Sequence, residues 1–155
     1  MSTYHAGQYR EIEVKTATPT ELVVLLYDAA IAGLREAKSH LQAGDIANRV
    51  RCINKVTAIL SELQANLNFE AGGDIARSLD RLYNYLIDRI FEANAKQDDS
   101  PLLEAIKLMD DLRSAWIDVA RSEGSQRKAA ALSANAEVGI KTSETTSMSS
   151  VNVTA

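Results

Sequence analysis

The stretch TATPTELVVLLYDAAIAGL, residues 16–34, combines a helix start with an almost wholly apolar helix. Thr18 is a predicted N-cap, Pro19 suits the first helical position, and Glu21 completes a capping box. The rest of the stretch carries Asp28 as its only charge. A helix that is apolar on nearly every side must be enclosed by other helices or by a partner. It is too short for the about 20 apolar residues that a membrane span needs.

The composition narrows the classes of protein that the chain can represent. Its 155 residues are the length of one domain, and its formal net charge is −4. This charge argues against a nucleic-acid partner, because affinity for phosphates depends on clustered Lys and Arg. The chain has no signal-peptide pattern and no long apolar run, so we expect a cytoplasmic protein without membrane insertion. Cys52 is the only cysteine, which excludes an internal disulfide and favours a small, buried apolar side chain.

Three further helices are predicted from apolar residues that recur at steps of three and four. Turn residues at 44–45, 68–73 and 98–101 separate them, and Asp74 is expected to cap the third helix. Loops this short force neighbouring helices to lie antiparallel. The sequence therefore predicts an all-α, antiparallel up-down-up-down four-helix bundle over residues 18–121, with coiled-coil-like packing of its core.

The two ends of the chain do not share this pattern. Residues 1–17 lack a sustained helical period, and we expect them to be extended. Their apolar residues Tyr9, Ile12 and Val14 are predicted to form a cover or clasp over a groove. Residues 122–155 are small and polar and rich in Ser and Thr, so a largely disordered tail is expected.

No arrangement of residues typical of catalysis or metal binding is found. His5 and His40 are the only histidines, and neither has the spacing to carboxylates that a metal site in a bundle needs. The glycines at 72–73 lack the Lys and Ser or Thr of a phosphate-binding loop. Adjacent Asp residues at 110–111 point in different directions on a helix and indicate a solvated face. We therefore predict no enzyme activity, no cofactor and no metal.

The second and third predicted helices carry more apolar residues than the roughly three in seven that a bundle needs. One interpretation is a hydrophobic groove that receives amphipathic helices of a partner. The other is that the wide stripe packs under the N-terminal segment and the first helix. Tyr27 and Trp116 are expected to be core aromatics. The predicted groove consists of Ile53, Val56, Ile59, Leu60, Leu63, Leu79, Tyr83, Leu86 and Ile87.

Several short phrases occur in an order that resembles one known family. They are TATP followed by Glu-Leu at 16–22, LLYD at 25–28, INK at 53–55, LY and YL at 82–86, and LR with AW at 112–116. Each phrase alone is weak, but their combination resembles the FliS-type flagellar export chaperones. The resemblance implies a non-enzymatic four-helix bundle in the bacterial cytosol. Members of this family usually end soon after the fourth helix. This chain differs, because it continues for about thirty residues beyond that point.

The resemblance also implies a client. It is the disordered C-terminal region of flagellin, bound one to one, shielded from premature polymerisation and kept competent for type III flagellar secretion. Contact with the flagellar export apparatus is left open. The alternative is a non-enzymatic helical adaptor bundle that self-associates or binds another amphipathic helix. A stable homodimer would favour the adaptor, and a monomer that forms a one-to-one complex with flagellin would favour the chaperone.

Overall fold

The computed structural model describes residues 16–148, with side-chain exposure given for residues 16–137. These described residues form helices and no strand. The helices are α2 (Pro19–Ala43), α3 (Ile46–Ala65), α4 (Phe69–Lys96) and α5 (Ser100–Met148). The chain divides into two compact units, Met1–Ile117 and Asp118–Ala155.

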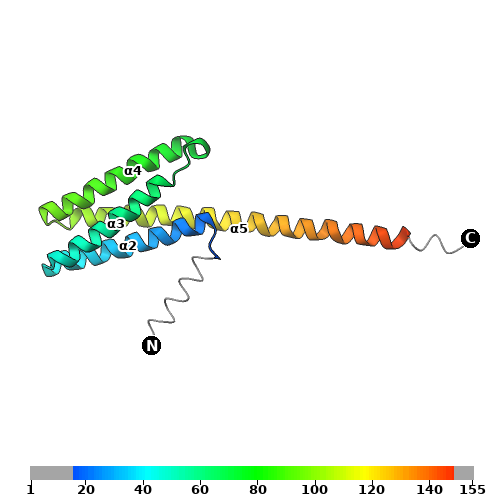
Figure 1. Cartoon of the computed structure of the whole chain (residues 1–155), viewed down its shortest axis with the longest axis horizontal. Helices are drawn as coiled ribbons and strands as arrows, with labels where there is room; N and C mark the ends of the chain where they lie inside the picture. Colours follow the sequence, from blue (N-terminus) through cyan, green and yellow to red (C-terminus); the bar gives the residue numbers. More distant parts are fainter. Residues whose placement is uncertain (1–15, 149–155) are drawn as a thin grey trace, which may run out of the picture. The chain divides into compact units, whose positions relative to one another are not determined.

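Within the first unit, α2, α3, α4 and the beginning of α5 run in alternating directions (Figure 1). Each connection is only a few residues long, so consecutive helices have to reverse direction. The predicted all-α, antiparallel four-helix bundle is thereby confirmed. No helix among the described residues is both long enough and apolar enough to cross a membrane.

Helix α2 begins and ends as local chemistry requires. The hydroxyl of Thr18 accepts a hydrogen bond from the Glu21 N–H at 3.2 Å, and the Glu21 carboxylate accepts one from the Thr18 N–H at 3.2 Å. This is the predicted capping box, with Pro19 at the first helical position. Gly44 ends the helix in the left-handed region at φ 71°, where a residue without Cβ carries little strain.

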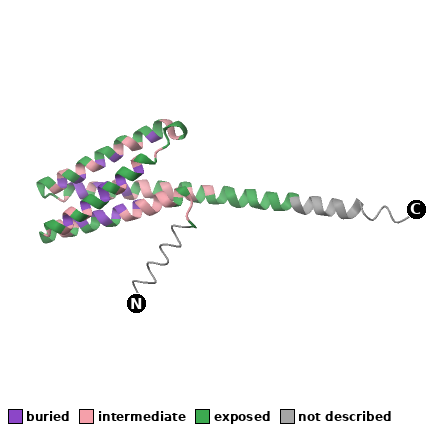
Figure 2. Ribbon diagram, in the orientation of Figure 1, coloured by how far each residue is buried: buried purple, intermediate pink, exposed green. Residues whose placement is uncertain are grey.

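The core runs through the middle of the bundle, where buried residues from all four helices meet (Figure 2). Helices α2 and α3 come especially close at Gly33. A Cβ built at Gly33 would lie 2.6 Å from Cγ2 of Val56, closer than two carbon atoms can approach. The buried apolar residues are Tyr27, Ala30, Ile31, Leu34, Ala37, Ile53, Val56, Leu60, Leu63, Ala76, Tyr83, Leu86, Ile90, Ala93, Leu102, Ala105 and Met109.

Helix α4 differs from its predicted start. The sequence indicated a loop over 68–73 with Asp74 as the cap, whereas the helix begins at Phe69 and Asn68 caps it through the Ala71 N–H. The reason is that Asn68 is itself a good N-cap and the next residues complete a helical turn. Gly73 then interrupts the helix with φ 47° and ψ −122°, so the long regular part still starts at residue 74.

Helix α5 extends past the bundle into the C-terminal segment. We expected a largely disordered segment over 122–155, but the helix continues through Met148. The continuation contains no proline and several alanines, which have the highest helix propensity. Its side chains are almost all exposed between residues 121 and 137. The low hydrophobicity of this segment agrees with the exposed side chains of its described part.

Candidate functional site

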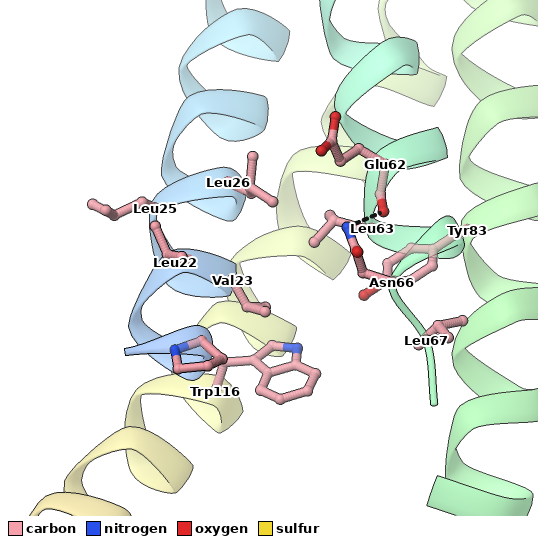
Figure 3. A pocket seen from close by; sticks show the side chains of 11 residues that line it. Leu22, Val23, Leu25, Leu26, Glu62, Leu63, Asn66, Leu67, Tyr83 and Trp116 are labelled. Atoms are coloured by element: carbon pink, nitrogen blue, oxygen red, sulfur yellow. Dashed lines mark hydrogen bonds between the residues drawn. The ribbon is translucent and has the colours of Figure 1, made fainter. Parts of the chain in front are cut away.

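An apolar pocket of about 670 Å³ opens at the end of the bundle where α2 begins and α3 ends (Figure 3). In Figure 3, Val23 and Trp116 lie on one side of the pocket, and Leu63, Leu67 and Tyr83 lie on the other. The residues that line the pocket are Pro19, Leu22, Val23, Leu25, Leu26, Glu62, Leu63, Asn66, Leu67, Tyr83 and Trp116.

The first turns of α2 supply the largest share of this lining. Leu22, Val23, Leu25 and Leu26 are four apolar residues in the first two turns, and each is only partly buried. Consecutive residues of a helix point about 100° apart, so a wholly apolar stretch cannot turn every side chain into one core. The surplus apolar surface of α2 thus becomes a wall of the pocket.

The charged and amide groups of the lining, Glu62 and Asn66, belong to the end of α3. The N–H and side-chain amide of Asn66 donate to the main-chain oxygen of Glu62 at 3.1 and 2.9 Å, which closes the end of α3. Glu62 is the only charged residue of the lining, and it is exposed. A surface of this kind binds apolar side chains through loss of water contact, and it contains no nucleophile next to a base.

A buried aromatic pair joins the pocket-lining Tyr83 to α2. Tyr83 of α4 is 1% exposed, and its hydroxyl hydrogen-bonds to that of Tyr27, which is fully buried on α2. Burial is the main cause that raises the pKa of both hydroxyls above the usual 10.0, so both are neutral near pH 7. The prediction that Tyr27 is a core aromatic is confirmed.

The structure separates the nine residues of the predicted groove into two sets. Buried in the core are Ile53, Val56, Leu60, Leu63, Tyr83 and Leu86. Partly buried against the core are Ile59, Leu79 and Ile87. The first set contributes to the core, and of its six members Leu63 and Tyr83 also line the pocket.

The predicted N-terminal cover, Tyr9, Ile12 and Val14, lies outside the described residues. The described chain begins at Thr16, three residues before Pro19, which lines the pocket. Trp116 was expected in the core; it packs against the core and also lines the pocket. Among the residues that the structure describes, no group of three or more His, Cys, Asp or Glu could hold a metal ion.

Sequence reasoning missed the contribution of α2 to this site. It placed the surplus apolar surface on α3 and α4 because their stripes exceed the usual width. The residues after Glu21 are apolar on nearly every side of the helix, and such a helix must be covered on several sides. This pattern could have indicated that α2 contributes to the site. No periodicity could show that Leu67 and Trp116, 49 positions apart in the numbering, face the same pocket.

Comparison with known proteins gives consistent matches. The family model described as flagellar protein FliS matches residues 1–123. The flagellar secretion chaperone FliS of Vibrio cholerae is 34% identical over 104 residues, which are 67% of this chain and 76% of the relative. That of Bacillus subtilis is 30% identical over 119 residues, 77% of this chain and 88% of the relative.

A solved structure has the same fold. It is described as a crystal structure of a flagellar chaperone from bacteria, and it aligns with a TM-score of 0.64 over 79% of this chain and 99% of its own. The sequence identity is 17%, so this likeness concerns the fold alone.

Proposed function

Because the chain belongs to the FliS family of flagellar secretion chaperones, we propose that it binds the C-terminal region of flagellin in the bacterial cytoplasm. Binding would prevent premature polymerisation and keep the subunit competent for type III flagellar secretion. The observation that supports this proposal is the apolar pocket between the start of α2, the end of α3 and Trp116. The proposed action is equilibrium binding, with no chemical step.

The chemistry of the pocket suits a client of this kind. A disordered segment loses conformational entropy when it orders on a partner, and burial of apolar surface must offset that loss. The pocket offers nine apolar or aromatic side chains and a single exposed charge, Glu62. An amphipathic helix or turn that places apolar side chains in the pocket would gain most of its affinity there.

The proposed binding surface extends beyond the pocket along α3 and α4. The partly buried residues Ile59, Leu79 and Ile87 pack against the core yet keep some exposed area. They remain proposed contacts of the client, as do the pocket-lining Leu63 and Tyr83, whereas the other buried members of the predicted groove hold these helices in place. A client that contacts both regions would bind one copy of the chain, which gives the proposed one-to-one complex.

The N-terminal segment is proposed to cover the pocket in the absence of client. Fifteen residues precede Thr16, where the described chain begins next to the pocket-lining Pro19. Tyr9 and Val14 are at most ten residues from Pro19, so the chain is long enough to place their side chains over an opening of this size. Displacement of the cover by client would exchange one apolar contact for another.

Calorimetric titration with intact flagellin and with flagellin shortened at its C-terminus tests the proposal. We expect a one-to-one complex with the intact protein and no heat with the shortened one. Measurement of the mass of the free chain belongs to the same experiment. A stable homodimer that does not bind flagellin would overturn the proposal and favour the self-associating adaptor.

A further inference from the structure

Three aromatic residues meet where α2, α4 and α5 come together at the pocket. Tyr27 and Tyr83 are 0% and 1% exposed, and their hydroxyl oxygens lie 2.5 Å apart. Their rings are tilted by 56° with centroids 6.5 Å apart, so the contact is made through the hydroxyls and not through stacked faces. Trp116 of α5 lines the same pocket as Tyr83.

These three side chains have more donor hydrogens than they can use among themselves. Each phenol supplies one O–H and the indole supplies one N–H, and only the two phenol oxygens can accept. The Tyr27–Tyr83 bond uses one of the two hydroxyl hydrogens. Two hydroxyls cannot donate to each other along one line, so one hydroxyl hydrogen points elsewhere.

The lining of the pocket identifies the tyrosine that carries this hydrogen. Tyr83 lines the pocket together with Trp116, whereas Tyr27 does not. We infer that Tyr27 donates to Tyr83, that Tyr83 offers its hydrogen to the pocket, and that the bound segment supplies a carbonyl oxygen as acceptor. Tyr83 is then a specificity-determining residue, because a purely apolar segment would leave a buried donor unpaired. This inference rests on the proposed function of the pocket.

The electrostatics of the lining favour an uncharged acceptor over a carboxylate. The pocket contains no Lys, Arg or His, and its only charge is the carboxylate of Glu62. A second carboxylate would be repelled by Glu62 and would lose water without gaining a cation. A carbonyl of the peptide backbone, or of an Asn or Gln side chain, accepts the hydrogen at a much smaller cost of desolvation.

Two matched substitutions distinguish a direct contact of Tyr83 with the client from a purely structural role of Tyr83. Tyr83→Phe and Tyr27→Phe both remove the inter-tyrosine hydrogen bond, but only Tyr83→Phe removes the donor at the pocket. We expect Tyr83→Phe to weaken binding of the flagellin C-terminal region about threefold to tenfold, the loss of one hydrogen bond. Tyr27→Phe should bind within about twofold of the unchanged protein, since Tyr83 keeps its hydrogen.

Equal effects of both substitutions, or no effect of Tyr83→Phe, would overturn the inference. If Tyr83→Phe does not fold, the double variant Tyr27→Phe/Tyr83→Phe takes its place, because the double variant buries no unpaired hydroxyl. Its affinity is then compared with that of Tyr27→Phe. The ratio of affinities should be the same at low and high salt; a ratio that falls with salt indicates a charged acceptor and overturns the assignment of a carbonyl. Failure of the unchanged protein to bind flagellin would instead contradict the proposed function.

Discussion

The hydroxyls of Tyr27 and Tyr83 join α2 to α4 across 56 positions of sequence, and Tyr83 also lines the apolar pocket. This bond ties the stability of the bundle to the protonation of two phenols. It also places a polar contact next to the side chains that are proposed to receive a client.

The alkaline stability of the bundle should depend on this pair. Burial raises the pKa of both tyrosines above 10.0, so the folded state keeps protons that the unfolded state has lost at higher pH. The pair's contribution to stability is complete below pH 10 and declines as the pH rises towards the folded pKa values. The free energy of unfolding should fall by about 1.4 kcal/mol per pH unit for each tyrosine.

Urea denaturation at a series of pH values above 10 measures this decline. The double variant Tyr27→Phe/Tyr83→Phe is the control, and it should show a shallower decline than the unchanged protein. Identical slopes for the two proteins would contradict the prediction.

The close approach of α2 and α3 should tolerate no side chain at Gly33. In Gly33→Ala the new methyl group would lie against Val56 of α3, and overpacking of this kind costs about 1–3 kcal/mol. Thermal denaturation followed by circular dichroism measures the loss. Gly124→Ala is the matched control, because nothing lies within 4 Å of a Cβ there and Ala favours a helix by about 1 kcal/mol over Gly.

Val56→Ala tests the cause of that loss. In the Gly33→Ala background it should cost less than it does alone, because it makes room for the new methyl group. A Gly33→Ala protein as stable as the unchanged one would show that the helices can separate freely.

The fluorescence of Trp116 should report filling of the pocket. It is the only tryptophan of the chain, and it lines the pocket while remaining partly exposed. Binding of a tryptophan-free C-terminal flagellin segment should remove water from the indole and shift its emission to shorter wavelength. Leu67→Asp, which places an unpaired charge in the lining, should weaken binding at least about tenfold.

Ile75→Asp is the control for this substitution. Ile75 is 72% exposed on α4 and does not line the pocket, so the same change of charge should leave binding and the emission shift intact. If Ile75→Asp weakens binding and Leu67→Asp does not, the client lies on another face of the bundle.

Acid should weaken the contact between α4 and α5. Glu104 of α5 accepts hydrogen bonds from the Tyr85 hydroxyl and, at 2.8 Å, from Nη2 of Arg89, and these bonds lower the pKa of its carboxyl below 4.5. A lowered pKa means that the stabilisation is complete above pH 4.5 and is lost as the pH falls through the folded value. Glu104→Gln should therefore lower the melting temperature modestly at pH 7, and the difference should disappear in acid.

Melting curves of both proteins between neutral and acidic pH test this dependence. Glu62→Gln is the control, since the exposed carboxylate of Glu62 forms no ion pair among the described residues. A difference that persists at low pH would mean that the shape of the Glu104 side chain, and not its charge, holds α4 and α5 together.

Removal of the proposed cover should strengthen client binding. If residues 1–15 occupy the pocket for part of the time, the measured affinity is reduced by the fraction of covered molecules. The triple variant Tyr9→Ser/Ile12→Ser/Val14→Ser should then bind flagellin about threefold to tenfold more tightly. The measurement is calorimetric titration.

Glu11→Gln/Glu13→Gln, in the same segment, is the matched control and should leave the affinity unchanged. A triple variant with unchanged or weaker affinity would show that the segment does not compete with the client.

The sequence alone determined the class and topology of the fold. The capping box of Thr18 and Glu21, the spacing of apolar residues by three and four, and the short connections are local features, and local features decide helix starts and the reversal of neighbours. The resemblance to the FliS family, stated from phrases between residues 16 and 116, is confirmed by the family match over residues 1–123.

Tertiary structure decided which apolar side chains are available to a partner. Periodicity gives the faces of a helix but not its rotation against its neighbours, so Ile53, Val56 and Leu86 could be core or groove until the packing was known. The pocket combines the start of α2 with Leu67 and Trp116, which are distant in sequence and adjacent only because the helices reverse direction. A property of one helix can be read from its own residues, whereas a pocket is made by several helices at once.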